Sequence, residues 1–350
     1  MKSHFKTLST ALALITGVSF AAPAIAQSEC NDVALLFNNF LPPNHTFWAG
    51  GFKPWADDVA RVTDGRVAVT FTTASLAPPP KQWGMVTDGI ADVAMQVNPM
   101  ESKRLHLPNI GGLPFVGNLA TARGVALWRT HEKFFAAANE FKGVHLVGHF
   151  SNPGAGLIAG DMVDGIDSID GMKFWTIGGP PADIVSAIGA VPVPAPGEEM
   201  FNMFSKGVVD GLATNWGAMK IWNAYRYTKS YVDIPGGLYA VDFSVIMNQG
   251  KWDSICASDQ EAITAVSGET IARNVGLFVD EFDIETQKEV AETDIKVVKP
   301  DAAFMGALED KLQYARDAWM AKAEARGVDG EAALAYYLEQ VAALTAELSK

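Results

Sequence analysis

The residues best placed for metal chemistry are two histidines, His145 and His149, which stand four positions apart. On a helix that spacing brings two metal ligands together, but residues 144–149 are predicted to form a strand. In a strand the two side chains share one face about 13 Å apart, which is too far to hold a single ion. We therefore predict no metal site in this chain.

The sequence lacks the common motifs for catalysis and for nucleotide binding. The sequence contains no HExxH, no GxSxG and no phosphate-binding P-loop. Gly154, Gly156 and Gly160 give a GxGxxxG spacing, but no clear helix follows them, and the next predicted strand lacks the acidic residue of a dinucleotide fold. We interpret these glycines as a hinge-like connection. No catalytic residue and no cofactor are assigned, and we predict that the chain is not an enzyme; an exported enzyme stays an alternative.

The two cysteines, Cys30 and Cys256, are too few for a four-ligand zinc site, and no CxxC motif occurs. In an oxidising compartment they can form one disulfide. The sequence does not fix their separation in space, so a bridge and two free thiols both stay open.

Strands and helices alternate in two successive sets, which predicts an α/β protein with two lobes. The first set has strands at 32–37, 66–72 and 91–97 and helices at 48–63 and 83–90. The second set has strands at 144–149, 173–176 and 212–215 and helices at 180–188 and 198–206. Residues 239–248 predict a strand that returns to the first lobe.

A long helix is predicted at 259–293, where apolar residues recur at helical spacing. At 1.5 Å per residue it would span roughly 50 Å and could brace both lobes. A pair of helices broken near Gly268 or Gly276 is the alternative. The alanine-rich tail, 301–349, predicts two further helical segments separated by Gly327 and Gly330.

The N-terminus has the pattern of a secretory signal peptide. Lys2 and Lys6 form a basic region before an apolar stretch at 8–20, and Ala24 and Ala26 supply the small residues before a cleavage site. We expect cleavage after Ala26 and a location in the periplasm. The alternative is a membrane anchor, but the apolar stretch is shorter than the about 20 residues that span a bilayer.

Charge and length limit the partners and the architecture. Loss of residues 1–26 would lower the 27 basic side chains to 25, against 40 acidic ones. Such an excess of acid speaks against nucleic acid as a partner. The mature chain of about 320 residues is longer than one simple core usually holds, which again favours two lobes.

Motifs in a fixed order along the chain resemble the periplasmic solute receptors of TRAP (tripartite ATP-independent periplasmic) transporters. They occur in this sequence at 44–45, 65–67, 88–92, 113–115, 169–173, 188–196, 207–211 and 246–253. The resemblance implies the two-lobed periplasmic binding protein fold, similar to type II, with a long helix bridging both lobes. Ligand would bind between the lobes, which close over it.

From this resemblance we divide the chain into a signal peptide and two lobes. Residues 1–26 form the signal peptide, residues 27–150 and about 237–280 form lobe I, and residues 151–236 and about 281–350 form lobe II with the C-terminal helices. The expected partners are a small organic solute and the membrane permease subunits of a TRAP transporter, with the receptor as a monomer. A sensor that presents ligand to a membrane kinase is an alternative function.

The chain departs from the family pattern at Trp175. Receptors of this family usually carry an arginine there, two residues after a lysine that is Lys173 here, and it pairs with the ligand carboxylate. Tryptophan offers a flat apolar face and one N–H donor instead. An aromatic carboxylate stacked on Trp175 is favoured, with Arg104 or Lys81 as the anion partner. A sulfonate, zwitterionic or neutral solute is the alternative, and Trp175 could also be a core residue.

The candidate ligand-binding residues are polar or aromatic side chains near the ends of predicted strands, which conventionally face ligand in α/β sheets. They are Trp175, Asn215, Asn38, His45, Trp48, Lys81, Gln82, Asn98, Arg104, Thr214 and Trp216.

Overall fold

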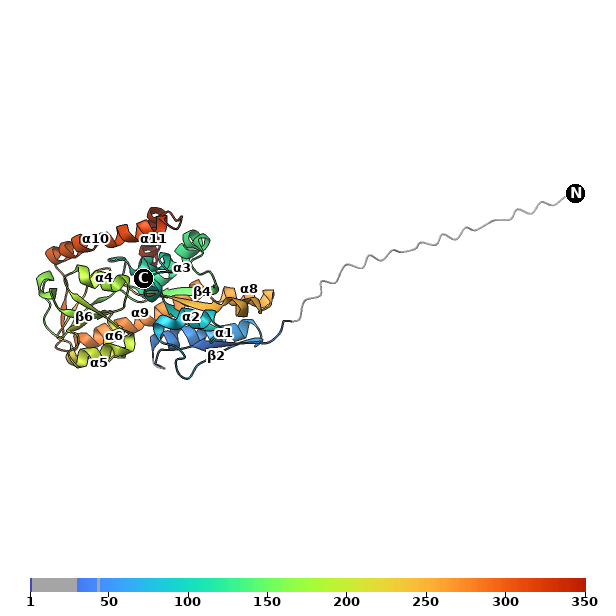
Figure 1. Ribbon diagram of the computed structural model, residues 1–350, viewed down its shortest axis with the longest axis horizontal. Coiled ribbons are helices and arrows are strands. Elements are labelled where there is room, and N and C mark those ends of the chain that lie inside the picture. The colour runs from blue at the N-terminus through green and yellow to red at the C-terminus, as the bar shows by residue number, and fades with distance from the viewer. Residues whose placement is uncertain (2–29, 43–44) are drawn as a thin grey trace.

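The computed structural model describes Met1 and residues 30–42 and 45–350 of the chain. The predicted signal peptide, 1–26, lies outside the described residues except for Met1. Two mixed sheets, each flanked by helices, lie on either side of a central region that the long helix α9 (Glu269–Ala291) crosses (Figure 1). Among the described residues, no helix is long and apolar enough to cross a membrane.

The first sheet has the strand order β2-β1-β3-β10-β4. Its strands are β1 (Val33–Asn38), β2 (Val67–Phe71), β3 (Val93–Val97), β4 (Val144–Ser151) and β10 (Asp242–Asn248). β1 runs parallel to β2 and β3, and β10 returns antiparallel between β3 and β4. Every residue of β3 is buried because helices cover both faces of the sheet centre.

The helices of the first lobe fill the connections of this sheet. They are α1 (Lys53–Val62), α2 (Gln82–Thr87), α3 (Ala120–Thr130), α7 (Gln249–Asp253) and α8 (Ala257–Ala265). The segment before α1 is also helical, so that one continuous helical stretch runs from Thr46 to Val62. Pro54 lies in the first turn of α1, where a missing N–H costs little.

The second sheet has the order β11-β9-β5-β8-β6-β7. Its strands are β5 (Gly156–Ala159), β6 (Lys173–Thr176), β7 (Val191–Pro194), β8 (Gly211–Thr214), β9 (Ser230–Val232) and β11 (Lys296–Val298). Its helices are α4 (Pro180–Ala187), α5 (Met200–Ser205) and α6 (Gly217–Ile221). The predicted hinge at 154–160 is therefore wrong in part, because Gly156–Ala159 pairs as β5 with β8 and β9.

Two chain segments cross between the sheets and pair with each other. Asn152 N donates to Val241 O at 2.9 Å, Ala155 N to Tyr239 O at 2.7 Å, and Leu238 N to Ala155 O at 2.7 Å. One of the two segments connects β4 to β5, the other connects β9 to β10, and these hydrogen bonds form a short ladder between them. Because both crossings are hydrogen-bonded side by side, they form one strap between the lobes rather than two independent linkers.

The long helix predicted at 259–293 is two helices, α8 and α9, so the prediction of a single helix is wrong and its alternative is confirmed. The break falls at Gly268, whose φ of +55° and ψ of −118° do not fit a helix. Its N–H donates to Val147 O of β4 at 2.9 Å. A Cβ there would lie 2.6 Å from the Trp128 ring, so close packing of α3 on the helix pair requires glycine.

α9 joins the lobes through two aspartates that lie one turn apart. Asp280 accepts hydrogen bonds from Ala120 N at 2.6 Å and Thr121 N at 3.0 Å, at the start of α3 in the first lobe. Asp283 accepts from Asn215 Nδ2 at 2.7 Å and Gly217 N at 2.5 Å, at the start of α6 in the second lobe. α9 therefore bridges both lobes, as predicted, with about 35 Å of helix.

The tail forms the helices α10 (Ala302–Glu324) and α11 (Gly330–Leu348), with Gly327 in a left-handed turn between them. α10 runs along α4 of the second lobe, whereas α11 packs on α3 of the first (Figure 1). We therefore place α11 with the first lobe and keep the other lobe boundaries as proposed.

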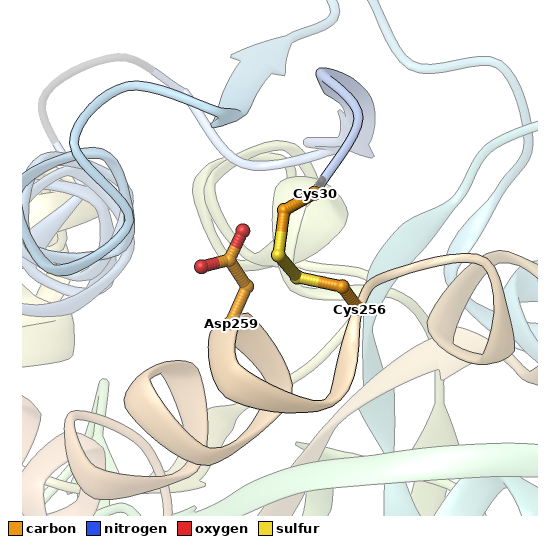
Figure 2. A group of neighbouring side chains, drawn as sticks. All are labelled: Cys30, Cys256 and Asp259. Atoms are coloured by element: carbon orange, nitrogen blue, oxygen red, sulfur yellow. A yellow bond between two sulfur atoms is a disulfide. The ribbon is translucent and has the colours of Figure 1, made fainter. Parts of the chain in front are cut away.

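Cys30 and Cys256 form a disulfide between the segment before β1 and the N-cap of α8 (Figure 2). Asp259 lies beside it, and its two oxygens accept from Arg66 Nε at 3.0 Å and Nη2 at 2.7 Å. A group of two cysteines and an acid can resemble a metal site. Here the sulfurs are bonded to each other and the carboxylate is occupied by arginine, so the group is structural.

We expect that replacing both cysteines, Cys30→Ser with Cys256→Ser, lowers the free energy of unfolding by about 3–5 kcal/mol, because the bridge closes a loop of 226 residues in the unfolded chain. Urea unfolding followed by circular dichroism measures the change. The wild-type protein in excess reductant is the matched control and should unfold with the double variant. Equal midpoints for oxidised wild type and variant would contradict the prediction.

Candidate functional site

A cleft of about 1040 Å³, open solvent at its mouth included, lies between the two sheets. Segments of both lobes and of the crossing strap contribute to its wall. Aromatic and polar side chains of this wall include His45, Phe47, Trp175, Glu198, Thr214, Asn215, Trp222, Tyr239, Phe243, Phe282 and Asp283.

Most of the cleft wall is aromatic or aliphatic. On the first lobe Phe47 lies edge-on to Phe243, with ring centroids 5.1 Å apart, and Phe243 stacks on Phe150. On the second lobe Trp175 and Trp222 line the space, and Tyr239 lies on the crossing strap between them and the first lobe. Walls of this kind bury the body of an apolar ligand, and a few placed polar groups orient it.

Trp175 is positioned by β6, which lies between β7 and β8 in the second sheet. The residue is 3% exposed, and its indole Nε1 is buried without a hydrogen-bond partner among the described residues. Its neighbour in the cleft wall is already satisfied, since Tyr239 OH donates to Ala213 O at 2.5 Å and lies 2.9 Å from Thr176 Oγ1. Trp175 thus lines the cleft and carries a buried donor without a partner among the described residues.

Thr214 ends β8 and Asn215 follows it directly, and the two form a polar part of the cleft wall on the second lobe. Thr214 Oγ1 donates to Asn215 Oδ1 at 3.2 Å, and Asn215 Nδ2 donates to Asp283 Oδ1 at 2.7 Å. Burial raises the pKa of Asp283 from 3.8 to about 7, against the lowering effect of Gly217 N–H and Asn215, and the nearby charge of Asp280 adds to the rise. The amide of Asn215 is therefore held in one orientation from both ends.

His45 stands at the start of the helical stretch that ends in α1. Its Nδ1 accepts from Phe47 N at 3.3 Å, and its ring lies 4.5 Å from that of Phe47. Burial lowers the pKa of His45 to about 4, so the imidazole is neutral at physiological pH. His45 therefore gives the cleft shape and a helix cap but no positive charge.

Fixed charge in the cleft is negative only. Its ionisable carboxyl groups are those of Glu198, exposed at the rim, and Asp283. Neither lysine nor arginine occurs among the described residues that line it. An anionic ligand would therefore meet hydrogen-bond donors rather than a cation.

The structure brings four of the predicted site residues to the cleft: Trp175, His45, Thr214 and Asn215. Trp216 lies one residue further on, but its ring turns away from the cleft and stacks on Tyr231, with centroids 3.6 Å apart. Trp216 already has helical backbone angles as the N-cap of α6, so its side chain leaves the direction of the preceding strand.

Three predicted polar residues of the first lobe are buried outside the cleft lining; Asn38 and Gln82 have partners for both ends of their amides, whereas Asn98 Nδ2 has no partner among the described residues. Asn38 Nδ2 donates to Gln82 Oε1 at 2.8 Å, and Gln82 Nε2 donates to Ala77 O at 2.7 Å, so the pair holds the proline-rich loop against the first sheet. Asn98 Oδ1 accepts from Ser244 Oγ at 2.8 Å. These amides satisfy backbone and side-chain groups outside the cleft lining.

The remaining predicted residues also lie outside the lining. Trp48 packs on Phe71, with centroids 4.2 Å apart, and Lys81 is exposed. Arg104 lies over the Trp83 ring, 4.6 Å from its centroid, with Glu101 at 3.5 Å. Neither Lys81 nor Arg104 is placed as the anion partner that we expected for the ligand.

Several cleft residues were not predicted, above all Tyr239, Phe243, Phe282 and Asp283. Tyr239 and Phe243 flank the return of the chain into the first sheet, where alternate residues of the predicted strand must face its two sides. The sequence shows that residues of this strand alternate between two faces, but it does not show which face meets the second lobe. Asp283 had one available signal, an acidic residue on the otherwise apolar face of a predicted helix.

The lobes touch beside the cleft at Gly179, which precedes α4. Gly179 has a φ of +85°, and a Cβ on it would lie 2.5 Å from Pro99 O of the first lobe. At Gly178 a Cβ would find Pro194 at 3.8 Å, an ordinary contact. Glycine at 179 therefore lets the second lobe approach the backbone of the first.

For Gly179→Ala we expect a larger radius of gyration in small-angle X-ray scattering, because the added methyl group and the left-handed backbone oppose this approach. Gly178→Ala is the matched control and should scatter like the wild type. Scattering curves that coincide for all three proteins would show that the contact at Gly179 does not limit the closeness of the lobes.

For Asp283→Asn we expect a gain in melting temperature relative to wild type that grows as pH rises from about 4 to about 8. A folded-state pKa above the unfolded one stabilises the fold fully below pH 3.8, and this stabilisation is lost as pH rises through about 7. Asparagine keeps an oxygen for Gly217 N and does not titrate.

Calorimetric melting of both proteins at matched pH values measures this difference. Other buried groups that titrate in the range, such as Asp242, are present in both proteins and cancel in the difference. A difference in melting temperature that is constant with pH would mean that Asp283 does not carry the raised pKa.

Comparison with known proteins gives a consistent result. Residues 37–322 match the model of a family described as bacterial extracellular solute-binding protein, family 7 (DctP). A protein of Comamonas testosteroni named outer membrane transporter protein TsaT is 34% identical over 335 residues, which cover 94% of this chain and 98% of that protein.

Two solved structures illustrate the similarity of fold. A TRAP periplasmic solute binding protein from Bordetella bronchiseptica with bound (R)- and (S)-mandelate is 30% identical, with a TM-score of 0.86, and the match covers 89% of this chain and 99% of that one. A TRAP solute binding protein from Rhodoferax ferrireducens with copurified benzoate is 20% identical, with a TM-score of 0.80 and coverage of 91% and 100%.

Proposed function

This chain belongs to bacterial extracellular solute-binding protein family 7, the solute receptors of TRAP transporters, and we propose that its solute is a small aromatic carboxylate. The family resemblance expected from the sequence is thereby confirmed, as is the two-lobed fold. Receptors of this family bind small molecules in the periplasm, work with membrane permease subunits and are not enzymes. Cleavage after Ala26 and a monomeric state stay predictions.

The observation that carries the proposal is the aromatic wall of the interlobe cleft. Phe47 and Phe243 of the first lobe, Trp175 of the second lobe and Tyr239 of the strap all line the cleft. A flat ring buried among such side chains gains about 25 cal/mol per Å² of apolar surface removed from water. Aliphatic dicarboxylates lack that surface and would bring a second charge into a cleft with no lysine or arginine in its described lining.

The relative with bound mandelate supports the same ligand class. It is 30% identical over nearly its whole length, and mandelate combines one phenyl ring with one carboxylate. A ligand of that size and shape fits a cleft that is mostly apolar with a small polar part at Asn215 and Thr214. The absence of a cation from the described lining also keeps a neutral aromatic solute as the second candidate.

Calorimetric titration of the mature protein tests the ligand class. We expect (R)-mandelate, benzoate or 3-hydroxybenzoate to bind with a dissociation constant of about 10 μM or lower, and succinate not to bind measurably. Benzyl alcohol and benzamide serve as neutral controls of matching shape. Binding of the neutral compounds alone would replace the aromatic carboxylate with a neutral solute, and tight binding of succinate would reject an aromatic ligand.

The role of Trp175 can be tested by removing its ring. We expect Trp175→Ala to weaken binding of the best aromatic ligand by roughly 100-fold, because the loss of a stacked ring also leaves a cavity in the cleft wall. The ligand-free variant should still unfold cooperatively in a thermal melt. Unchanged affinity would show that the ligand does not contact this side chain.

Trp175→Arg places a cation in the wall at the same position. We expect a gain in affinity for simple aliphatic acids, because arginine offers two parallel donors to a carboxylate. The same titrations measure it. If no aliphatic acid gained affinity, the cleft would differ from that of other family members at more positions than this one.

A further inference from the structure

We propose that the solute's carboxylate is held in the cleft by uncharged N–H donors, the indole Nε1 of Trp175 among them, and not by a lysine or arginine side chain. This inference rests on the proposed function, since it concerns how an aromatic acid would be recognised. It is carried by three observations: the charges in the cleft wall, the positions of the nearby cations, and one donor that lacks a partner.

The cleft wall offers no positive side chain within the part of the chain that the structure describes. His45 is the residue that could become cationic, but its burial lowers its pKa to about 4 and its Nδ1 already accepts from Phe47 N. The acids present, the rim residue Glu198 and Asp283 in its ionised form, would repel a ligand carboxylate and not attract it. Recognition by a salt bridge therefore has no residue in the described lining to supply it.

The two basic side chains that the sequence suggested as anion partners both lie outside the cleft lining. Arg104 lies on the Trp83 ring and beside Glu101, and Lys81 is exposed. The buried Arg123 donates through its guanidinium to the carbonyl oxygens of Gly111 and Gly117, at the edge of the first lobe. Arg123 is fully buried and does not line the cleft, so freeing it would cost those bonds.

Among the polar side chains of the wall, Trp175 has a buried donor without an acceptor. Its Nε1 has no partner among the described residues, whereas Tyr239 OH, Thr214 Oγ1 and Asn215 Nδ2 each donate within the protein. A buried N–H left unpaired is unfavourable, so an acceptor supplied by the ligand would recover the lost hydrogen bond. The bond would be charge-assisted, and a carboxylate would gain more from it than a neutral oxygen.

The start of the helical stretch 46–62 adds a second uncharged source of positive potential. Thr46 and Phe47, its first residues, line the cleft, and because Phe47 N already donates to His45 Nδ1, the helix contributes its dipole there and not that N–H group. The N-terminus of a helix carries partial positive charge on its free N–H groups. A carboxylate between this end and Trp175 would be bound by dipoles alone, which keeps the site compatible with its apolar wall.

The test uses Trp175→Phe, which keeps an apolar ring and removes the N–H. With (R)-mandelate as the probe, we expect roughly 10-fold or greater loss of affinity in calorimetric titration, the loss typical of a hydrogen bond to a charged group. Trp252→Phe is the matched control, because Trp252 stacks on His145 away from the cleft, and it should bind as wild type does. Thermal melts check that both variants are folded.

A spectroscopic measurement separates a hydrogen bond from a loss of packing. In the ¹H–¹⁵N spectrum of the wild type, the Trp175 indole signal is identified by its disappearance in Trp175→Phe, and it should move downfield when (R)-mandelate is added. If Trp175→Phe bound (R)-mandelate with the affinity of the wild type, or if the indole signal of the wild type did not move, the inference would be overturned. The proposed function would still stand. Wild-type protein that binds no aromatic acid would reject the proposed function itself.

Discussion

Two buried carboxylates one helical turn apart on α9 tie the two lobes to one helix, and the cleft lies between the lobes that they join. Asp280 accepts from the first N–H groups of α3, and Asp283 accepts from Asn215 and the start of α6. A buried carboxylate requires such donors, since leaving it without them costs far more than one ordinary hydrogen bond. Asp283 also lines the cleft, so the contact that joins the second lobe to the helix orients a polar group of the site as well.

The strap of crossing segments and α9 are thus two separate connections between the lobes. The strap joins the sheets through backbone hydrogen bonds, while the aspartates attach both lobes to one helix. Gly179 shows how closely the lobes approach, since even a methyl group there would meet the backbone of Pro99. A ligand enclosed by such an approach loses most of its water, which favours a ring-shaped body and makes each unpaired donor in the wall significant.

Local patterns predicted most of the elements that surround the cleft. Proline at the first turn of α4, the apolar run of β3 and the helical spacing along α9 each depend on neighbours in sequence, so they were visible without a structure. β5 was not, because Gly156 and Gly160 resemble a loop; Gly156 is required there since a Cβ would meet Val232 O and the Tyr231 ring. The break at Gly268 likewise depends on Trp128 and Val147, which lie far away in the sequence.

By itself the sequence determined the α/β class, the doubling into two lobes, the receptor family and the presence of Trp175 where the family usually has arginine. Only the tertiary structure decided that Trp175 shares a cleft with His45, Thr214 and Asn215, while Asn38 and Gln82 bond to each other in the first lobe. It also decided that Cys30 and Cys256 form a disulfide. The physical reason is that periodicity records which residues share a face of one element, whereas a cleft is made where faces of distant elements meet.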